Sequence, residues 1–431
     1  MKNVIKTAGR AIRLSQCMIV KNEEKNIERA LTWAKDIAFE QIVVDTGSSD
    51  HTVEIAERMG AKVFHFKWIE DFSAAKNYAI DQASGDWIAF LDADEYINAE
   101  HARLIIPLIE SIVNLHDGKA VALTSKWVHV NDEGGVIQID RQERIFINHT
   151  GVRYERPIHE TLKIPAGTFP VVENDISIIH TGYSHSAYAD VGKLERNITL
   201  LKKTLESAPE DVKSKYYLAN SLDVSGNIEE AIPLYREVLN ETACGKSSYE
   251  WFRVNAFYRL TAHLVNKTKA LDEACNLAEQ AFHEFPEHVN FCCLYGTVLY
   301  NCGQFENALK AFGKAEKLVA DGKIEGQLAR NIDALHIYLA RVNIKLDNHA
   351  EALRHAASYL QSNKRHEDML KLCMSILRSK DSPENTVNFL SKIYNLKNID
   401  DKMQLLRCAK GMGDAALAQI FIKMITPGDF R

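Results

Sequence analysis

Two aspartates, Asp92 and Asp94, stand two positions apart directly after the apolar run at residues 87–91. Carboxylate oxygens are ligands that suit Mg²⁺ and Mn²⁺, and sites of this kind keep open positions for phosphate oxygens. A pair of carboxylates at the end of a buried strand can therefore share one hard divalent cation. The sequence predicts such a cation site, with room beside it for a phosphate-bearing ligand.

The elements around this pair predict where it lies. Apolar runs at residues 14–20, 41–44, 61–66 and 86–91 read as strands, and residues 24–36, 52–59 and 72–83 between them read as helices. Strands that alternate with helices indicate βαβ units and a largely parallel sheet. Ligands of such sheets bind beyond the carboxyl ends of the strands. Asn22, Glu23, Asp45 and the aspartate pair all fall at those ends.

The pattern changes after residue 119. Residues 121–130, 136–140, 143–148 and 176–180 read as strands, and residues 131–135 read as a turn. This segment is expected to complete the same domain as a mixed or antiparallel section.

From about residue 190 the chain becomes helical and repetitive. Six residues from Pro209 to Tyr235 align with six residues from Pro286 to Phe312, each pair 77 positions apart. Small residues stand 12 positions apart in four pairs: Ala219 and Ala231, Ala262 and Ala274, Gly296 and Ala308, Ala340 and Ala352. Small residues let paired helices approach closely, and a period of about 34 residues is typical of tetratricopeptide repeats. A generic helical bundle is the alternative.

Composition narrows the class of protein. The chain has 431 residues and a net charge of −6, so it has no basic surplus for a nucleic-acid partner. No apolar run reaches the length of about 18 residues that a spanning helix needs, and residues 1–13 lack the apolar core of a secretory signal. The 8 cysteines form no CxxC pair, which favours free thiols in the cytoplasm.

Four stretches together resemble the family 2 glycosyltransferases with the GT-A fold: residues 20–24, 44–52, 72–77 and 91–95. The resemblance implies an α/β GT-A (Rossmann-like) catalytic domain at residues 1–190. An all-α domain of tetratricopeptide type follows at residues 191–431. The combination is similar to a bacterial subgroup that includes the S-glycosyltransferase of the bacteriocin sublancin.

The resemblance assigns donor contacts to several of these residues. It implies that Asp45 binds the uracil ring and that Asn22 and Glu23 contact the donor. A turn aspartate and a solvated helix start are the alternatives. The family usually has Arg-Asn contacting the donor where this chain has Lys76 and Asn77. Lysine keeps the charge but lacks the bidentate fork of arginine.

The resemblance also assigns the metal site. The last aspartate, Asp94, binds the cation directly, while Asp92 contacts the ribose or metal-bound water. His180 fits as a third ligand through a neutral imidazole nitrogen, against the alternative of a structural histidine. A divalent cation there stabilises the charge on a departing nucleoside diphosphate.

A second group of polar residues stands at positions 153–160. We predict Glu160 as the general base that takes the acceptor proton, with His159 orienting it or touching the donor. A salt-bridged strand end is the alternative, and Asp140 and, less favoured, Glu95 are rival bases. Arg144, together with Arg141, is expected to meet the diphosphate or to be an exposed strand residue.

The predicted function is a metal-dependent inverting glycosyltransferase that uses Mg²⁺ or Mn²⁺ and a nucleotide-sugar donor, with UDP as the expected nucleotide. The repeats are expected to present a peptide or protein acceptor, although repeat arrays also form homodimers. Two alternatives stay open. One is transfer to a saccharide or lipid-linked glycan of the cell envelope, and the other is a scaffold with an inactive transferase domain.

Overall fold

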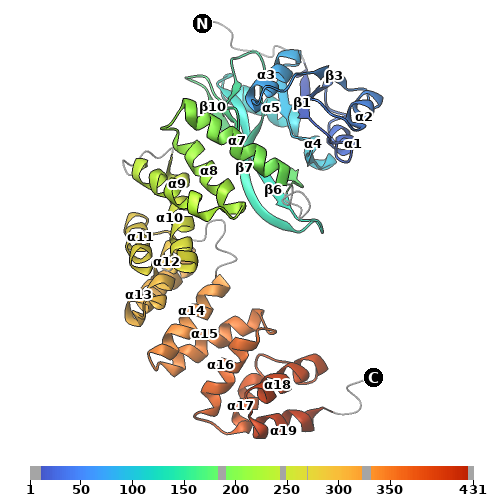
Figure 1. Ribbon diagram of the computed structural model, residues 1–431. Helices are drawn as coiled ribbons and strands as arrows, with labels where there is room; N and C mark the ends of the chain where they lie inside the picture. The colour runs from blue at the N-terminus through green and yellow to red at the C-terminus, as the bar shows by residue number, and fades with distance from the viewer. Residues whose placement is uncertain (1–10, 183–190, 243–248, 269, 323–331, 426–431) are drawn as a thin grey trace. The chain divides into compact units, whose positions relative to one another are not determined.

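The computed structural model describes residues 11–182, 191–242, 249–268, 270–322 and 332–425 (Figure 1). The chain divides into two compact units, residues 1–227 and 228–431. The first unit contains the sheet and the helices α7 (Val191–Ser207) and α8 (Val212–Val224). The first compact unit therefore extends past the predicted domain boundary between residues 190 and 191. That boundary stays a prediction.

Eight strands form the sheet of the first unit, in the order β3-β2-β1-β4-β7-β6-β10-β5. They are β1 (Leu14–Val20), β2 (Glu40–Asp45), β3 (Lys62–His65), β4 (Trp87–Phe90), β5 (Glu95–Ile97), β6 (Ala120–Val130), β7 (Val136–Ile147) and β10 (Phe169–His180). The strands β1 to β4 are mutually parallel, whereas β7 runs antiparallel to both β4 and β6. The predicted parallel sheet with an appended mixed or antiparallel section is confirmed, and the section is mixed because β6 and β10 are parallel.

Helices cover the sheet because its central strands are apolar on both sides. All four residues of β4 are buried, and six of the seven residues of β1 are buried. The covering helices are α1 (Ile27–Thr32), α2 (Thr52–Arg58), α3 (Phe72–Gln82), α4 (Ala99–Ala102) and α5 (Ile105–Leu115). A strand buried on both faces reads as a continuous apolar run, which is why these strands were predictable from the sequence.

Some predicted bounds differ from the structure. The helix expected at residues 24–36 is only α1 (Ile27–Thr32), because the backbone carbonyl of Glu23 accepts from Asn26 and Ile27 in a preceding turn. The strands expected at 136–140 and 143–148 are one strand, β7. The strand expected at 176–180 begins at Phe169, with an irregularity between Val172 and Ser177. The sequence analysis did not identify β5, which has three residues, or the hairpin of β8 (Arg153–Glu155) and β9 (Thr161–Lys163).

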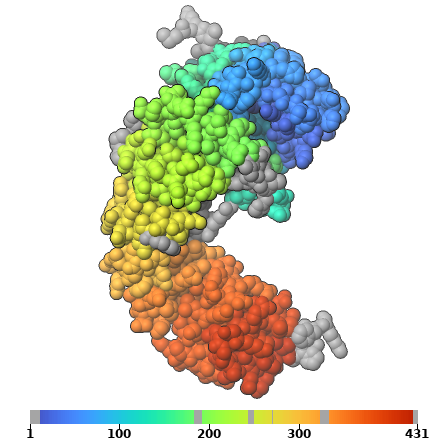
Figure 2. All heavy atoms as spheres, in the orientation of Figure 1, coloured from blue at the N-terminus to red at the C-terminus, as the bar shows by residue number. Residues whose placement is uncertain are grey.

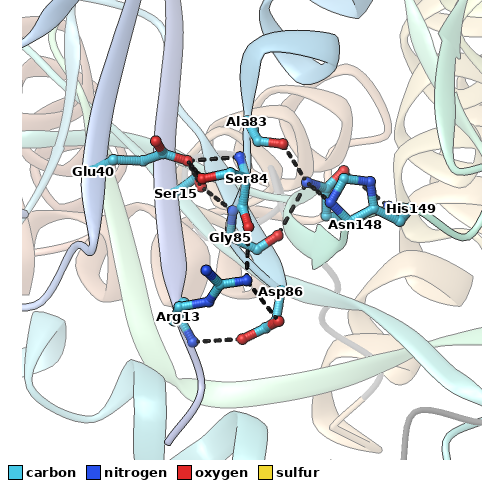
Figure 3. A network of polar contacts seen from close by, with 9 residues as sticks. All are labelled: Arg13, Ser15, Glu40, Ala83, Ser84, Gly85, Asp86, Asn148 and His149. Atoms are coloured by element: carbon cyan, nitrogen blue, oxygen red, sulfur yellow. Dashed lines mark hydrogen bonds and ion pairs between the residues drawn. The ribbon is translucent and has the colours of Figure 1, made fainter.

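A polar network joins the strands at the amino end of the parallel sheet (Figure 3). Glu40 accepts hydrogen bonds from the Ser15 hydroxyl at 2.7 Å and from the backbone N–H of Ser84 at 2.7 Å. The Ser15 oxygen in turn accepts from the Gly85 N–H at 3.0 Å, and the Asn148 amide donates to the Gly85 carbonyl at 3.0 Å. These contacts tie β1, β2, β4 and β7 at the edge opposite the predicted site.

Gly85 gives a test of this network. A Cβ at position 85 would lie 2.4 Å from the Ser15 oxygen and 2.8 Å from the Arg13 carbonyl oxygen. We expect Gly85→Ala to lower the free energy of unfolding by about 1–3 kcal/mol, because the backbone around it cannot yield freely. Gly313→Ala is the control, since a Cβ in that helix meets nothing within 4 Å. It should stabilise by about 0.5–1 kcal/mol in urea denaturation. Equal stability of Gly85→Ala and wild type would contradict the steric argument.

The second unit is built from successive α-helices. They are α9 (Ile228–Glu241), α10 (Glu250–His263), α11 (Leu271–Glu284), α12 (Val289–Asn301), α13 (Phe305–Ala320), α14 (Ile332–Lys345), α15 (His349–Ser362), α16 (Glu367–Arg378), α17 (Pro383–Leu390), α18 (Ile399–Gly411) and α19 (Ala415–Met424). A short π-helix, η2 (Leu264–Thr268), continues α10. A Cβ at Gly296 on α12 would lie 2.7 Å from the Phe312 ring on α13. The small residues of the predicted repeats therefore permit close helix pairing, and the predicted all-α region is confirmed.

Two expectations from composition concern the whole chain. Within the described ranges, no helix is long and apolar enough to cross a membrane. The described cysteines are free thiols, as predicted, and Cys244 lies outside the described residues.

Candidate active site

Sheet topology brings the predicted site residues to one edge. Since β1, β2 and β4 are parallel, Asn22, Asp45 and Asp92 all follow strand ends at the same side of the sheet. His180 reaches this edge from the end of β10, where it pairs in register with Glu95 on β5. That pairing places the His180 imidazole Nε2 at 3.5 Å from the Asp94 carboxylate oxygen Oδ2.

Lys76 links two of the predicted site carboxylates. Its ammonium lies 3.0 Å from an Asp92 oxygen and 2.6 Å from a Glu160 oxygen, and its side chain is only 2% exposed. Burial alone would lower the pKa of Lys76, but the two carboxylates outweigh it, and the net shift is upward. The lysine ammonium is a compact point charge that can contact both carboxylates at once. Lysine therefore suits this position, although the family usually has arginine there.

Arg144 holds Asp92 from the other side. Its guanidinium donates to Asp92 at 2.9 Å and to the buried carboxylate of Glu95 at 2.7 Å. Burial by itself would raise the pKa of Asp92, but Lys76 and Arg144 shift it well below its usual range. Asp92 is therefore ionised, with one carboxylate oxygen facing the Lys76 ammonium and the other facing the Arg144 guanidinium. In this structure Arg144 is a buried partner of carboxylates rather than an exposed strand residue, and its diphosphate contact stays a prediction.

Asp94 and His180 supply two ligand atoms that suit a divalent cation. The pair consists of a carboxylate oxygen and an imidazole nitrogen, both ligand types for Mn²⁺. A Cβ at Gly182 would lie 2.5 Å from the Asp94 Oδ2 and 2.5 Å from the His180 Nε2. The glycine therefore keeps the space in front of both ligand atoms clear of side chain.

Glu160 and His159 lie on the loop between β8 and β9, which contacts α8. The His159 ring stacks on the Tyr217 ring of α8 with centroids 3.6 Å apart. Burial lowers the pKa of His159 to about 4, so this imidazole is neutral near pH 7. Burial would raise the pKa of Glu160, but Lys76 outweighs it and the net shift is downward.

A salt bridge fixes the same loop to α8. The Arg156 guanidinium donates to both oxygens of Asp211, at 3.1 and 2.6 Å, and to the Ser214 hydroxyl at 2.9 Å. The atoms of α7 and α8, green in Figure 2, adjoin those of the sheet. The first two helices of the helical region thus help to position the loop that carries Glu160.

The residues predicted to contact the donor also form hydrogen bonds within the protein. Both oxygens of Asp45 accept from the backbone N–H of Ser48, at 3.0 and 3.3 Å, and the side-chain oxygen of Asn22 accepts from the Ser49 N–H at 2.8 Å. The Asn77 side chain bonds the backbone of Tyr154 in both directions at 2.9 Å, so it anchors β8 to α3. Burial raises the pKa of Glu23. Donor binding by these residues stays a prediction.

Several residues of the site were not identified from the sequence. Glu95 was considered only as a base, yet it is a buried anchor that also accepts from the Asp92 N–H at 2.9 Å. His129 and Tyr217 were not identified, and no role was assigned to Gly182. Their roles depend on strand register and helix packing, and no local motif marks them.

Comparisons with known proteins agree with this geometry. Residues 15–157 match the family model described as glycosyl transferase family 2. A TPR repeat-containing protein of Synechococcus elongatus is 34% identical over 233 residues, which are 51% of this chain and 54% of that protein. The SPbeta prophage-derived glycosyltransferase SunS of Bacillus subtilis is 28% identical over 229 residues, 52% of each chain. This chain spans about half the length of these two relatives.

The solved structure of YrrB, a TPR protein, covers 52% of this chain at 19% identity and a TM-score of 0.36. The match to the family model identifies residues 15–157 as a glycosyltransferase family 2 domain. The chain continues into a helical region, and part of the chain is similar to a TPR repeat-containing protein.

Proposed function

We propose that the chain is a metal-dependent, inverting glycosyltransferase that moves a sugar from a UDP-sugar to an acceptor in a single displacement. The observation that carries the proposal is the meeting of Asp94 and His180 in front of Gly182, at the sheet edge that also bears Asp45. Nucleotide ligands of parallel sheets bind at this edge. The free described cysteines support a cytoplasmic location.

Mg²⁺ or Mn²⁺ bound by Asp94 and His180 would supply positive charge to the departing nucleoside diphosphate. The other residues of the site keep that region organised. Asp92 stays ionised between Lys76 and Arg144, so it can accept hydrogen bonds from a ribose or from metal-bound water. Asp45, Asn22 and Glu23 are proposed to contact the nucleotide beyond β1 and β2. Lys76 and Asn77 are proposed to contact the donor from α3.

Glu160 is the proposed general base. It is ionised and joined to Lys76, and its carboxylate can take a proton from an acceptor group that arrives beside Asp92. Glu95 has a fully buried side chain bound to Arg144, so an acceptor cannot reach it. Asp140 already accepts from His129 and Gln138. His159, held by Tyr217, orients the loop that bears Glu160.

The acceptor is proposed to be a peptide or protein side chain bound by the helical repeats. The support is the link from α8 to the Glu160 loop through Asp211 and Tyr217, which joins the start of the helical region to the catalytic residues. In the alternative, the surfaces of the helical repeats form a homodimer interface rather than an acceptor-binding site. Transfer to a saccharide would be supported if purified glycans accept sugar and peptides do not.

The binding of UDP, measured by calorimetry with and without Mn²⁺, tests the metal site. We expect Gly182→Ala to weaken Mn²⁺-dependent UDP binding about 10- to 100-fold, because its Cβ would press on both ligand atoms. The variant keeps every charged group of the site. UDP binding without metal and the melting temperature serve as controls and should not change. Wild-type protein that binds UDP equally with and without Mn²⁺ would favour the inactive scaffold.

A further inference from the structure

Four polar side chains form a row across the side of the sheet that contains β7, β6 and β10. The His129 Nε2 on β6 lies 3.1 Å from an Asp140 oxygen on β7. The His129 Nδ1 lies 2.9 Å from the Nδ1 of His180 on β10. The His180 Nε2 then lies 3.5 Å from Asp94. A carboxylate thus stands at each end of the row, and two imidazoles connect them.

Strand register produces this row. His180 and His129 are direct partners on the adjacent parallel strands β10 and β6, so their side chains lie together. Asp140 pairs with Trp127, which stands two residues before His129 and therefore on the same face of β6. The Trp127 ring packs on both imidazoles, with centroids 4.2 Å from His129 and 4.9 Å from His180.

When a divalent cation occupies the Asp94 end, the Asp140 end of the row determines which nitrogen of each imidazole carries a proton. The hydrogen bond from His129 lowers the pKa of Asp140, so this carboxylate is ionised and only accepts. His129 therefore donates through Nε2–H, and in its neutral form Nδ1 is an acceptor. His180 must then donate to it through its own Nδ1–H. The Nε2 of neutral His180 is left with a lone pair, and it faces Asp94.

We propose that His129 and Asp140 are positioning residues that hold His180 in the Nδ1–H tautomer, so that its Nε2 can bind the divalent cation. The inference rests on the proposed function, since it requires the cation site at Asp94 and His180. Hydrogen-bond partners of this kind around a metal-binding histidine set its orientation and tautomer.

A second histidine pair in the chain shows the opposite arrangement. Ligand atoms of Glu316 on α13, His336 on α14 and His355 on α15 lie within 4.8 Å of one another. The Arg354 guanidinium lies 2.8 Å from the His355 Nε2, and a guanidinium only donates. His355 therefore carries its proton on Nδ1, the atom that lies 3.1 Å from the His336 Nδ1. Arg354 therefore leaves the proton of His355 on the Nδ1 that faces His336. Asp140 in the first pair instead holds a proton on the outer Nε2 of His129, so that the Nδ1 of His129 faces His180 as an acceptor.

The test compares wild type with His129→Phe, which keeps a ring against Trp127 but removes both nitrogens. Mn²⁺ affinity in the presence of UDP, from the electron paramagnetic resonance of free Mn²⁺, should fall about 10- to 100-fold. The ¹⁵N shifts of His180 in the complex with diamagnetic Mg²⁺ and UDP should show the Nδ1–H tautomer in wild type and a population of the Nε2–H tautomer in the variant. Asp140→Ala, whose native side chain is 43% exposed, should shift both readouts in the same direction with little effect on folding.

His336→Phe is the matched control, because it removes a histidine partner from the other pair and should leave Mn²⁺ affinity unchanged. Equal Mn²⁺ affinity in wild type, His129→Phe and Asp140→Ala would overturn the inference and leave the proposed function standing. An Nε2–H tautomer of His180 in wild type with Mg²⁺ and UDP bound would also overturn it. Wild type that binds no Mn²⁺ with UDP would instead overturn the metal site itself, and the inference with it.

Discussion

Asp94→Asn should reduce Mn²⁺-dependent nucleotide release from the preferred UDP-sugar by about a thousandfold or more. The substitution leaves the size of the side chain unchanged but removes the charge that, with His180, is proposed to hold the cation. The Asp94 backbone carbonyl accepts from both the N–H and the hydroxyl of Thr181 at 3.0 Å, and those contacts remain in the variant. We therefore expect a folded protein that has lost metal-dependent catalysis. A panel of UDP-, GDP- and dTDP-sugars with Mn²⁺ identifies the donor and measures the loss.

Asp132→Asn is the matched control for this prediction, because Asp132 is exposed on the turn between β6 and β7. Its rate of nucleotide release should equal that of wild type. A retained wild-type rate in Asp94→Asn would contradict the assignment of Asp94 as a ligand. Release from no donor by wild type would require a second measurement, the binding of intact donors, to separate strict acceptor dependence from an inactive domain.

Glu160→Gln should lower the rate of sugar transfer about 10²- to 10⁴-fold while the affinity for UDP and Mn²⁺ stays close to that of wild type. Glutamine has the shape of glutamate but cannot take the acceptor proton. Lys76 keeps its contact with Asp92 at 3.0 Å, so the charge beside the donor site is retained. Initial rates at saturating donor, together with calorimetric UDP binding, measure the two effects separately.

Glu155→Gln is the control for a change in the same hairpin. Glu155 on β8 is exposed and pairs with Lys163, so its variant should transfer sugar at the wild-type rate. Loss of UDP binding in Glu160→Gln would instead favour the salt-bridge interpretation, in which Glu160 acts only through Lys76. Full activity in Glu160→Gln would contradict the assignment of Glu160 as the base.

Much of the sheet could be predicted because its signals are local. A strand buried on both faces, such as β1, shows as an apolar run, and its bounds agree with the prediction at both ends. The carboxyl ends of parallel strands share one edge, so the placement of Asn22, Asp45 and Asp92 followed from the order of the elements. The three-residue strands β5, β8 and β9 were not identified, because three residues are too few to show a period.

The sequence by itself determined the class of the catalytic domain and the residue types of its site, because these are written in short motifs and in the period of apolar residues. Only the tertiary structure decided which side chains meet. His180 reaches Asp94 through the pairing of β10 with β5, and His129 reaches His180 through the pairing of β10 with β6. Such contacts join residues 51 or more positions apart, and their register depends on the packing of the whole sheet rather than on any local pattern.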